Sequence, residues 1–349
     1  MTSSERTRLV KQTAVEMGFD RVGIAPVDAP LHGEFLRAWL DRGYAGQMAY
    51  LHKRCELRTD PRRFFPGARS VICVAMNYYQ DDPDVELPDD ALWPRGRWAR
   101  YVWGQDYHIL IRRRLGAMRE RLEQRLGERF GSRCFVDTAP VMERSLAAAA
   151  GLGWIGKNAM LIVPRLGSFV FLGGVMTTLK LDPDPPVGDR CGRCRRCMDA
   201  CPTGAIVEPH VVDARRCVSY LTIEHRGSIP LELRPFVGNW VFGCDLCQRV
   251  CPHNLRIRPS KDPALAVRFP APTIALEELL HWSDEQYASA TRGRAIRRAG
   301  LAILRRNAVI AMGNIGGQKD LDVLKCVIQD RDPLVGEHAR WARDQVLSR

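Results

Sequence analysis

The sequence predicts an α+β multidomain protein of 349 residues in three consecutive parts. Residues 1–182 alternate strand-like and helix-like patterns, which indicates an α/β domain with one main sheet. Residues 183–260 carry two cysteine runs that end in Cys-Pro, which is typical of a bacterial two-cluster ferredoxin-like domain. Residues 261–349 contain paired amphipathic helices, which resemble a HEAT-like α-helical repeat.

Periodicity places the elements of the first part. Helices are predicted at 3–18, 31–43 and 109–127, and strands at 21–25, 70–76, 133–136, 159–163 and 168–178. Residues 81–94 are acidic and contain three prolines, so a surface loop is expected there. Residues 95–108 mix arginines with aromatics. Such a segment can bind a large planar or phosphate-bearing ligand, or it can be an ordinary amphipathic loop.

The cysteines of the second part have the spacing of iron–sulfur ligands. The first run is C-x2-C-x2-C-x3-C-P, and the second has the same form but with Val241 at its first cysteine position. The cysteine before each proline reaches the other cluster in such runs, and Cys217 is the natural replacement for the missing ligand. Two [4Fe–4S] clusters are predicted, one held by Cys191, Cys194, Cys197 and Cys251, and the other by Cys201, Cys217, Cys244 and Cys247.

Two other interpretations of these cysteines are weaker. A pair of zinc sites is possible in principle, but zinc sites rarely use Cys-Pro runs. A disulfide framework is disfavoured because the chain is long and has no signal peptide. Clusters imply one-electron chemistry or electron delivery to a second cofactor.

The absence of several sequence motifs limits the choice of second cofactor. The chain has no G-x-G-x-x-G opening a βαβ unit, no phosphate-binding P-loop and no C-x3-C-x2-C. Flavin, a corrinoid or direct electron transfer to a protein remain open. Asp137 follows a predicted strand, where α/β sites commonly lie. It is either a proton donor whose pKa is raised by an apolar site, or a turn residue.

The charge balance favours an anionic partner. The formal net charge is +12, and residues 292–317 contain six arginines and no acid. A helical face with such arginines can follow a phosphate backbone, or it can be a solvated cap. The N-terminus has no apolar signal region and no run of roughly eighteen apolar residues exists, so a cytoplasmic protein without membrane contact is expected.

Taken together, the motifs resemble those of epoxyqueuosine reductases. The similarity runs from G-F-D-R-V-G-I-A-P (18–26) to the helical tail, and it is carried by V-D-T-A-P-V-M-E-R (136–144), G-W-I-G-K-N (153–158), C-x-S-Y-L-T-I-E (217–224) and the two cysteine runs. The resemblance implies an oxidoreductase that reduces epoxyqueuosine to queuosine at the wobble position of tRNA anticodon loops. Electrons would pass from the two clusters to cobalamin, bound by the first part.

The resemblance also implies roles for individual residues. Asp137 matches the proposed proton donor. Positions matching those around the corrinoid are Arg58, Arg100, Asp137, Lys157, Asn158, Ser168 and Ser219. Because the implied substrate is a tRNA, the basic tail is expected to bind its phosphate backbone. The predicted tRNA-binding residues are Arg297, Arg298, Arg305 and Arg306. An external donor of flavodoxin, ferredoxin or reductase type is expected, and the self-contained chain favours a monomer.

The cobalt is expected to lack a histidine lower ligand. Corrinoid enzymes that use one contain D-x-H-x-x-G, and the nearest match, Asp106-Tyr107-His108, has Ile111 at the glycine position. Two alternative functions remain open at this stage. One is a related corrinoid iron–sulfur reductase of a small molecule, similar to a reductive dehalogenase, and the other is a non-catalytic ferredoxin-type electron carrier.

Overall fold

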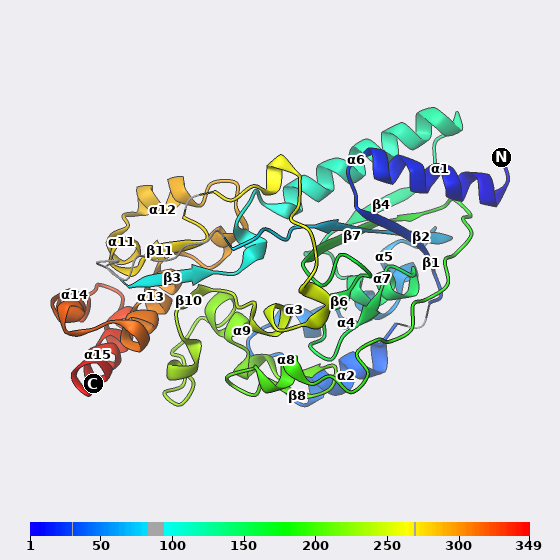
Figure 1. Ribbon diagram of the computed structural model, residues 1–349. Coiled ribbons are helices and arrows are strands. Elements are labelled where there is room, and N and C mark those ends of the chain that lie inside the picture. The colour runs from blue at the N-terminus through cyan, green and yellow to red at the C-terminus, as the bar shows by residue number, and fades with distance from the viewer. Residues whose placement is uncertain (30, 83–93, 269) are drawn as a thin grey trace.

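The computed structural model describes residues 1–29, 31–82, 94–268 and 270–349. Most of the surface loop predicted at 81–94 lies outside the described residues. Figure 1 shows the main sheet towards one end of the molecule, the C-terminal helices at the other end, and the cysteine-bearing segments between them. In the described part of the chain, no helix is long and apolar enough to cross a bilayer.

The main sheet has four antiparallel strands in the order β1-β2-β7-β4. They are β1 (Arg21–Pro26), β2 (Ser70–Asn77), β7 (Val170–Thr177) and β4 (Ser132–Phe135). The predicted strands and the predicted main sheet are therefore confirmed, except that 159–163 forms only the short strand β6 (Leu161–Ile162) of a hairpin with β5 (Trp154–Ile155).

Helices cover both faces of this sheet. One face of β2 packs on α1 (Ser3–Glu16) and α6 (Tyr107–Leu126), and the other packs on α7 (Glu143–Ala149). All eight residues of β2 are buried because successive side chains enter opposite cores. Gly23 in β1 lies so close to the Ala150 carbonyl that any Cβ would clash, which lets α7 approach the sheet.

Short helices and one more hairpin complete the first two parts. The first part adds α2 (Gly33–Asp41), α3 (Ala49–Lys53), α4 (Cys55–Thr59) and α5 (Pro61–Phe64). The cysteine-bearing part contains α8 (Arg196–Asp199), β8 (Ile206–Glu208), β9 (Val211–Val212), α9 (Val218–Ile223), β10 (Trp240–Phe242) and α10 (Leu246–Arg249). No long regular element occurs in the described residues between 183 and 260, so packing and ligation have to hold this part together.

The third part is helical, and its core draws on the first part. Its helices are α11 (Leu276–His281), α12 (Asp284–Ala290), α13 (Leu301–Ile315), α14 (Leu321–Val327) and α15 (Pro333–Leu347). A second sheet has the order β10-β3-β11, with β3 (Arg95–Trp98) between β10 and β11 (Thr273–Ala275). Residues 95–103 thus pack in the C-terminal core, because Trp98 and Trp103 are buried there.

Arg306 departs from its predicted role in tRNA binding. Its side chain is fully buried in α13 and donates to the carbonyls of Leu221, His225 and Gly227 and to the Asn307 amide oxygen. The prediction for Arg306 is wrong because the guanidinium is used to satisfy carbonyls at the end of α9. Arg305 is also engaged, with Asp330 and the Trp282 carbonyl.

We expect Arg306→Leu to destabilise the protein by about 3–5 kcal/mol, because three carbonyls would lose their buried charged donor. Urea unfolding of the variant under anaerobic conditions measures the change. Arg297→Ala is the matched control at an exposed arginine nearby, and its effect should stay within about 0.5 kcal/mol. Equal stability of Arg306→Leu and wild type would show that this network has no structural importance.

Candidate active site

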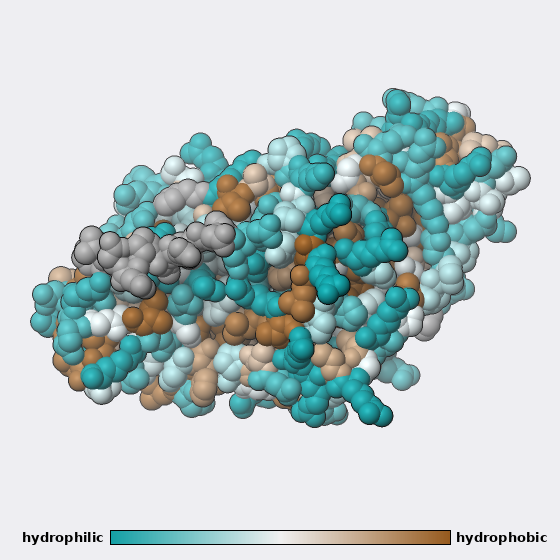
Figure 2. Space-filling model, viewed as in Figure 1, coloured by the Kyte–Doolittle hydropathy of each residue, from teal (hydrophilic) through white to brown (hydrophobic). Residues whose placement is uncertain are grey.

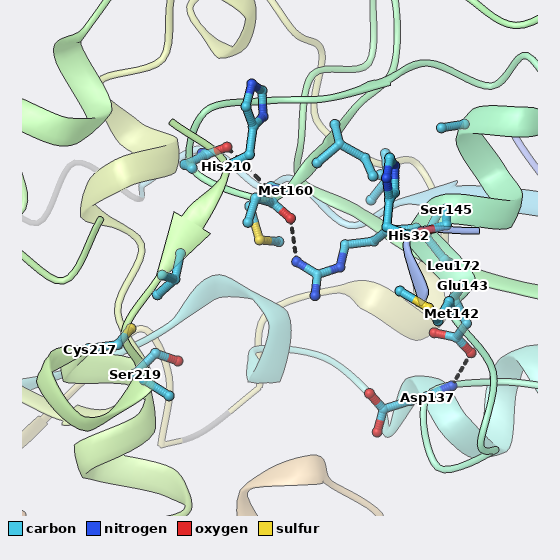
Figure 3. Close-up of a pocket in the computed structure, with 18 of the residues that line it drawn as sticks. His32, Asp137, Met142, Glu143, Ser145, Met160, Leu172, His210, Cys217 and Ser219 are labelled. Carbon is cyan, nitrogen blue, oxygen red and sulfur yellow. Dashed lines mark hydrogen bonds between the residues drawn. The ribbon is translucent and has the colours of Figure 1, made fainter. Parts of the chain in front are cut away.

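A large cavity lies where the three parts meet. Its volume is about 1980 Å³, well above the roughly 300–1,000 Å³ of most small-ligand pockets. Asp137 and Glu143 lie on one side of it, and Cys217 and Ser219 lie on the opposite side (Figure 3). Apolar side chains form much of the remaining wall, among them Met142, Met160, Val170 and Leu172.

The eight cysteines lie in two sets, and these are the two sets that spacing predicts. In the first set, Cys197 and Cys251 are both close enough to Cys191 for their charges to interact, and Cys251 interacts with Cys194 as well. In the second set, Cys217 interacts with Cys201, and Cys244 and Cys247 interact with Cys217. An interaction between Cys197 and Cys247 joins the sets, so the two sites are adjacent.

The second set opens onto the cavity and the first does not. Cys201, Cys217, Cys244 and Cys247 line the cavity wall, whereas no cysteine of the first set does. Within the described residues, no group of three or more His, Cys, Asp or Glu side chains has the geometry for a single metal ion.

Asp137 stands in the turn between β4 and α7 with a strained backbone. Its φ of +46° lies in the left-handed region that non-glycine residues rarely adopt. The Glu143 carboxylate accepts the backbone N–H of Asp137 and fixes the turn, as the dashed line in Figure 3 marks. Strain of this kind persists only where surrounding contacts hold it, and it is concentrated at functional sites.

His108 connects the Asp137 carboxylate with a second carboxylate. Asp106 caps the N-terminus of α6 through the His108 N–H and also lies 2.6 Å from its Nδ1. On the other side of the ring, His108 Nε2 lies 2.8 Å from Asp137 Oδ2. The ring therefore lies between two carboxylates, an arrangement that favours the protonated imidazolium.

Arg298 reaches this pair from the C-terminal part. It belongs to the short helix η6 (Ala295–Arg298), and its Nη1 donates to Asp137 Oδ2 at 3.0 Å. Its Nη2 lies 2.7 Å from His108 Nε2, an atom that cannot donate to Asp137 and accept from Arg298 at once. When His108 is protonated, this second contact is repulsive, so Arg298 is the member of the group most easily displaced.

The pKa shifts divide the carboxyl groups into two kinds. Burial alone would raise the pKa of Asp137, but His108 and Arg298 outweigh it and lower this pKa to about 2. The expectation that the site raises the pKa of Asp137 is therefore wrong, because two cations contact it. Burial lowers the pKa of His108, yet its bonds to Asp106 and Asp137 raise it overall. Burial and the charge of Asp137 raise the pKa of Glu143 to about 8.

The predicted corrinoid contacts fall into two groups. Arg58, Asn158 and Ser219 line the cavity together with Asp137. Lys157, Ser168 and Arg100 do not line it. The Lys157 ammonium donates to the Gly192 and Cys194 carbonyls, the Ser168 hydroxyl to Gln248, and the buried Arg100 guanidinium to Gln80 and Asp82. These three side chains brace the loops around the cavity.

Sequence reasoning missed Glu143, Asp106 and the true position of Arg298. A signal existed for the first two. Asp106 has the Asp-x-His spacing of a helix cap that also contacts the ring, and Glu143 belongs to the same motif, 136–144, as Asp137. No local signal places Arg298, since it lies 161 residues from Asp137 in the sequence.

Comparison with known proteins matches this geometry to one family. An epoxyqueuosine reductase from Pseudomonas aeruginosa is 42% identical over 336 residues, covering 95% of this chain and 92% of that protein. The chain belongs to the epoxyqueuosine reductase family. A family model described as epoxyqueuosine reductase QueG, DUF1730, matches residues 58–138, and one described as a 4Fe-4S double cluster binding domain matches residues 190–254.

Two solved epoxyqueuosine reductase structures have the same fold. One, in complex with an epoxyqueuosine-modified tRNA stem loop, has a TM-score of 0.89 at 29% identity and covers 98% of this chain and 90% of that chain. The other, from Bacillus subtilis with its catalytic loop swung out of the active site, has a TM-score of 0.88 at 28% identity with the same coverage.

The raised pKa of Glu143 predicts a pH dependence of stability. As the pH rises from 4.5, the unfolded chain releases the Glu143 proton, whereas the folded chain keeps it up to about pH 8. The folded state then binds more protons than the unfolded state, so Glu143 lowers the free energy of unfolding progressively across this interval. Glu143→Gln cannot titrate, and its stability should decline less over the same range.

The melting temperatures of Glu143→Gln and wild type at pH 5 and pH 8 measure this difference. Glu224→Gln, which removes another carboxyl that lines the cavity, is the matched control. An identical decline with pH in Glu143→Gln and wild type would mean that Glu143 ionises at the same pH in the folded and the unfolded chain.

Proposed function

We propose that this protein reduces epoxyqueuosine to queuosine at the wobble position of tRNA anticodon loops. Two [4Fe–4S] clusters would supply electrons to a bound cobalamin, and Asp137 would deliver a proton to the departing oxygen. One observation carries the proposal: the second set of cysteines and the Asp137–His108–Arg298 group line the same cavity. Electron supply and proton supply therefore converge on one space, which a non-catalytic electron carrier would not need.

The residues around the cavity fit a corrinoid. The volume of about 1980 Å³ has room for a macrocycle and a nucleoside, and much of the wall is apolar. Arg58, Asn158 and Ser219 would hold the polar edges of the ring, and Asn158 is itself linked to the Cys247 carbonyl. When bound, cobalamin supplies low-potential electrons to the substrate.

The side chains of the site handle the protons. Removing an epoxide oxygen as water takes two electrons and two protons. Asp137 is ionised in the free site, so the proton it delivers is drawn from His108, which Asp106 holds in position on the opposite side of the ring. The strained turn aims the Asp137 carboxylate into the cavity, and Glu143 holds that turn.

The tRNA would approach from the side of the C-terminal part. The chain has a net charge of +12, and the family includes a structure with a modified tRNA stem loop. Of the four arginines predicted to bind tRNA, Arg297 is exposed and Arg298 opens onto the cavity. The substrate base has to leave the loop stack to reach a buried site, which is easiest for an unpaired loop base.

The proposed domain boundaries separate cobalamin binding, cluster binding and tRNA binding. Residues 1–182 form the cobalamin-binding domain, residues 183–260 the two-cluster domain, and residues 261–349 a HEAT-like tRNA-binding domain. The helices α13 and α15, which pack closely against each other, support a repeat of this kind. The segment 95–103 crosses from the first domain into the core of the third.

Asp137→Asn should lower kcat on epoxyqueuosine-containing tRNA by about 10²–10⁴-fold, because the side chain can no longer carry the proton. Iron, sulfide and bound cobalamin should stay at wild-type levels in the anaerobically prepared variant. Glu224→Gln, at another carboxyl of the cavity wall, should turn over normally. Normal turnover by Asp137→Asn would remove Asp137 from the proton path.

Arg298→Ala should move the alkaline limb of the kcat/KM–pH profile to higher pH. The Arg298 charge disfavours protonation of His108 and Asp137, so its loss lets the pair keep its proton to higher pH. Arg297→Ala is the matched neighbour and should weaken tRNA binding without moving the limb. If both variants shifted the alkaline limb equally, the shift would result from weaker tRNA binding and not from a changed pKa of the His108–Asp137 pair.

A further inference from the structure

The loop that holds the first set of cysteines carries four arginines beside its predicted ligands. Arg190, Arg193, Arg195 and Arg196 alternate with Cys191, Cys194 and Cys197, and all four arginines are exposed. We name these four residues the arginine rim. In Figure 2, hydrophilic side chains project from the lower edge of the molecule, over the region of α8, β8 and α2 in Figure 1. The catalytic site uses none of the four.

The arginine rim surrounds the cluster farther from the cavity. The cysteines of the first set do not line the cavity. Cys197 of this set is nevertheless close enough to Cys247, of the set that does line it, for their charges to interact. On the proposed function, on which this inference rests, electrons therefore reach the first cluster before the second. An external reductant has to approach the first cluster closely, and the surface it meets there is the arginine rim.

We propose that the arginine rim is the docking surface for an acidic one-electron carrier protein. The carrier gives up one electron and is oxidised, and the first cluster is reduced by that electron. Two such encounters supply the two electrons for each epoxide removed, and the two protons come from the Asp137 side of the cavity and from water. Complementary charge accelerates such brief encounters and aligns the two redox centres.

The loop is braced in a way that suits a docking surface. The Lys157 ammonium donates to the Gly192 carbonyl at 2.6 Å and to the Cys194 carbonyl at 3.0 Å, which fixes the backbone between the ligands. A fixed backbone presents the arginines at constant positions, which lowers the cost of ordering the loop at each encounter. The chain that leaves Cys251 also exposes Leu255 and Arg256, an apolar side chain beside a basic one.

Position favours a protein carrier over RNA as the occupant. The tRNA has to present one base to the cavity, whose acid group meets Arg298 of the C-terminal part. The arginine rim is centred instead on the cysteines that are absent from the cavity wall. Within residues 189–199, two acids, Asp189 and Asp199, accompany the four arginines, so this exposed segment has a net positive charge that favours an acidic partner.

The test compares a protein reductant with a chemical one. The variant Arg190→Glu/Arg193→Glu/Arg196→Glu keeps Arg195, which pairs with Asp199. The matched control, Arg113→Glu/Arg121→Glu/Arg129→Glu, reverses three exposed arginines on α6 and just after it, far from α8 in Figure 1. Cobalamin-loaded enzyme is mixed with reduced acidic flavodoxin in a stopped-flow instrument, and cluster reduction is followed by absorbance at several ionic strengths.

The rim variant should be reduced by flavodoxin at least about tenfold more slowly at low ionic strength, with a weaker salt dependence. Its iron content, its turnover with dithionite and its affinity for tRNA should equal those of wild type and control. An unchanged rate with flavodoxin, or an equal loss of tRNA affinity, would overturn the proposal. Absence of epoxyqueuosine reduction by wild type with dithionite would refute the proposed function instead, because cluster reduction by flavodoxin is measured separately.

Discussion

The structure depends on one constraint: eight thiols from distant parts of the sequence have to form two adjacent sets. Cys201, Cys217 and Cys244 come from three separate loops, and Cys251 has to return to the loop that begins at Cys191. Short helices and loops carry almost all of these ligands, so side-chain contacts must hold them. Lys157, Asn158 and Arg306 provide such contacts, because each donates to backbone carbonyls of this part.

A second constraint acts at the opposite wall of the cavity, where one carboxyl group stays charged because cations contact it and another stays protonated. Asp137 stays ionised because His108 and Arg298 contact the same carboxylate, while nearby Glu143 is kept protonated by burial. Two carboxyl groups a few residues apart thus have opposite protonation states at neutral pH. On the proposed function, Asp137 therefore has to receive a proton from His108 before it can donate one.

The sequence was most informative where chemistry fixes the spacing. The cysteine sets could be predicted because ligand spacing is a local property of each run, and Asp137 could be placed because it follows a strand. The arginine-rich tail was less predictable. Arg305, Arg306 and Arg298 are close in sequence, yet one pairs with Asp330, one is buried under α9 and one reaches the cavity. The position of each arginine depends on its partners in the folded structure, and these partners cannot be predicted from the composition of the tail.

The same reasoning explains why the role of residues 95–108 could be predicted only in part. Its aromatics suggested a ligand surface, and Tyr101, Tyr107 and His108 do line the cavity. Trp98 and Trp103, however, are buried in the C-terminal core, where β3 lies between β10 and β11. This one segment therefore ties the acid group to the part of the chain that carries Arg298. A shift of the C-terminal part on tRNA binding would act directly on Arg298, and through it on the charge of Asp137. On the proposed function, the substrate and the proton donor therefore meet at Arg298, while the cysteine set that would supply electrons lies on the opposite wall.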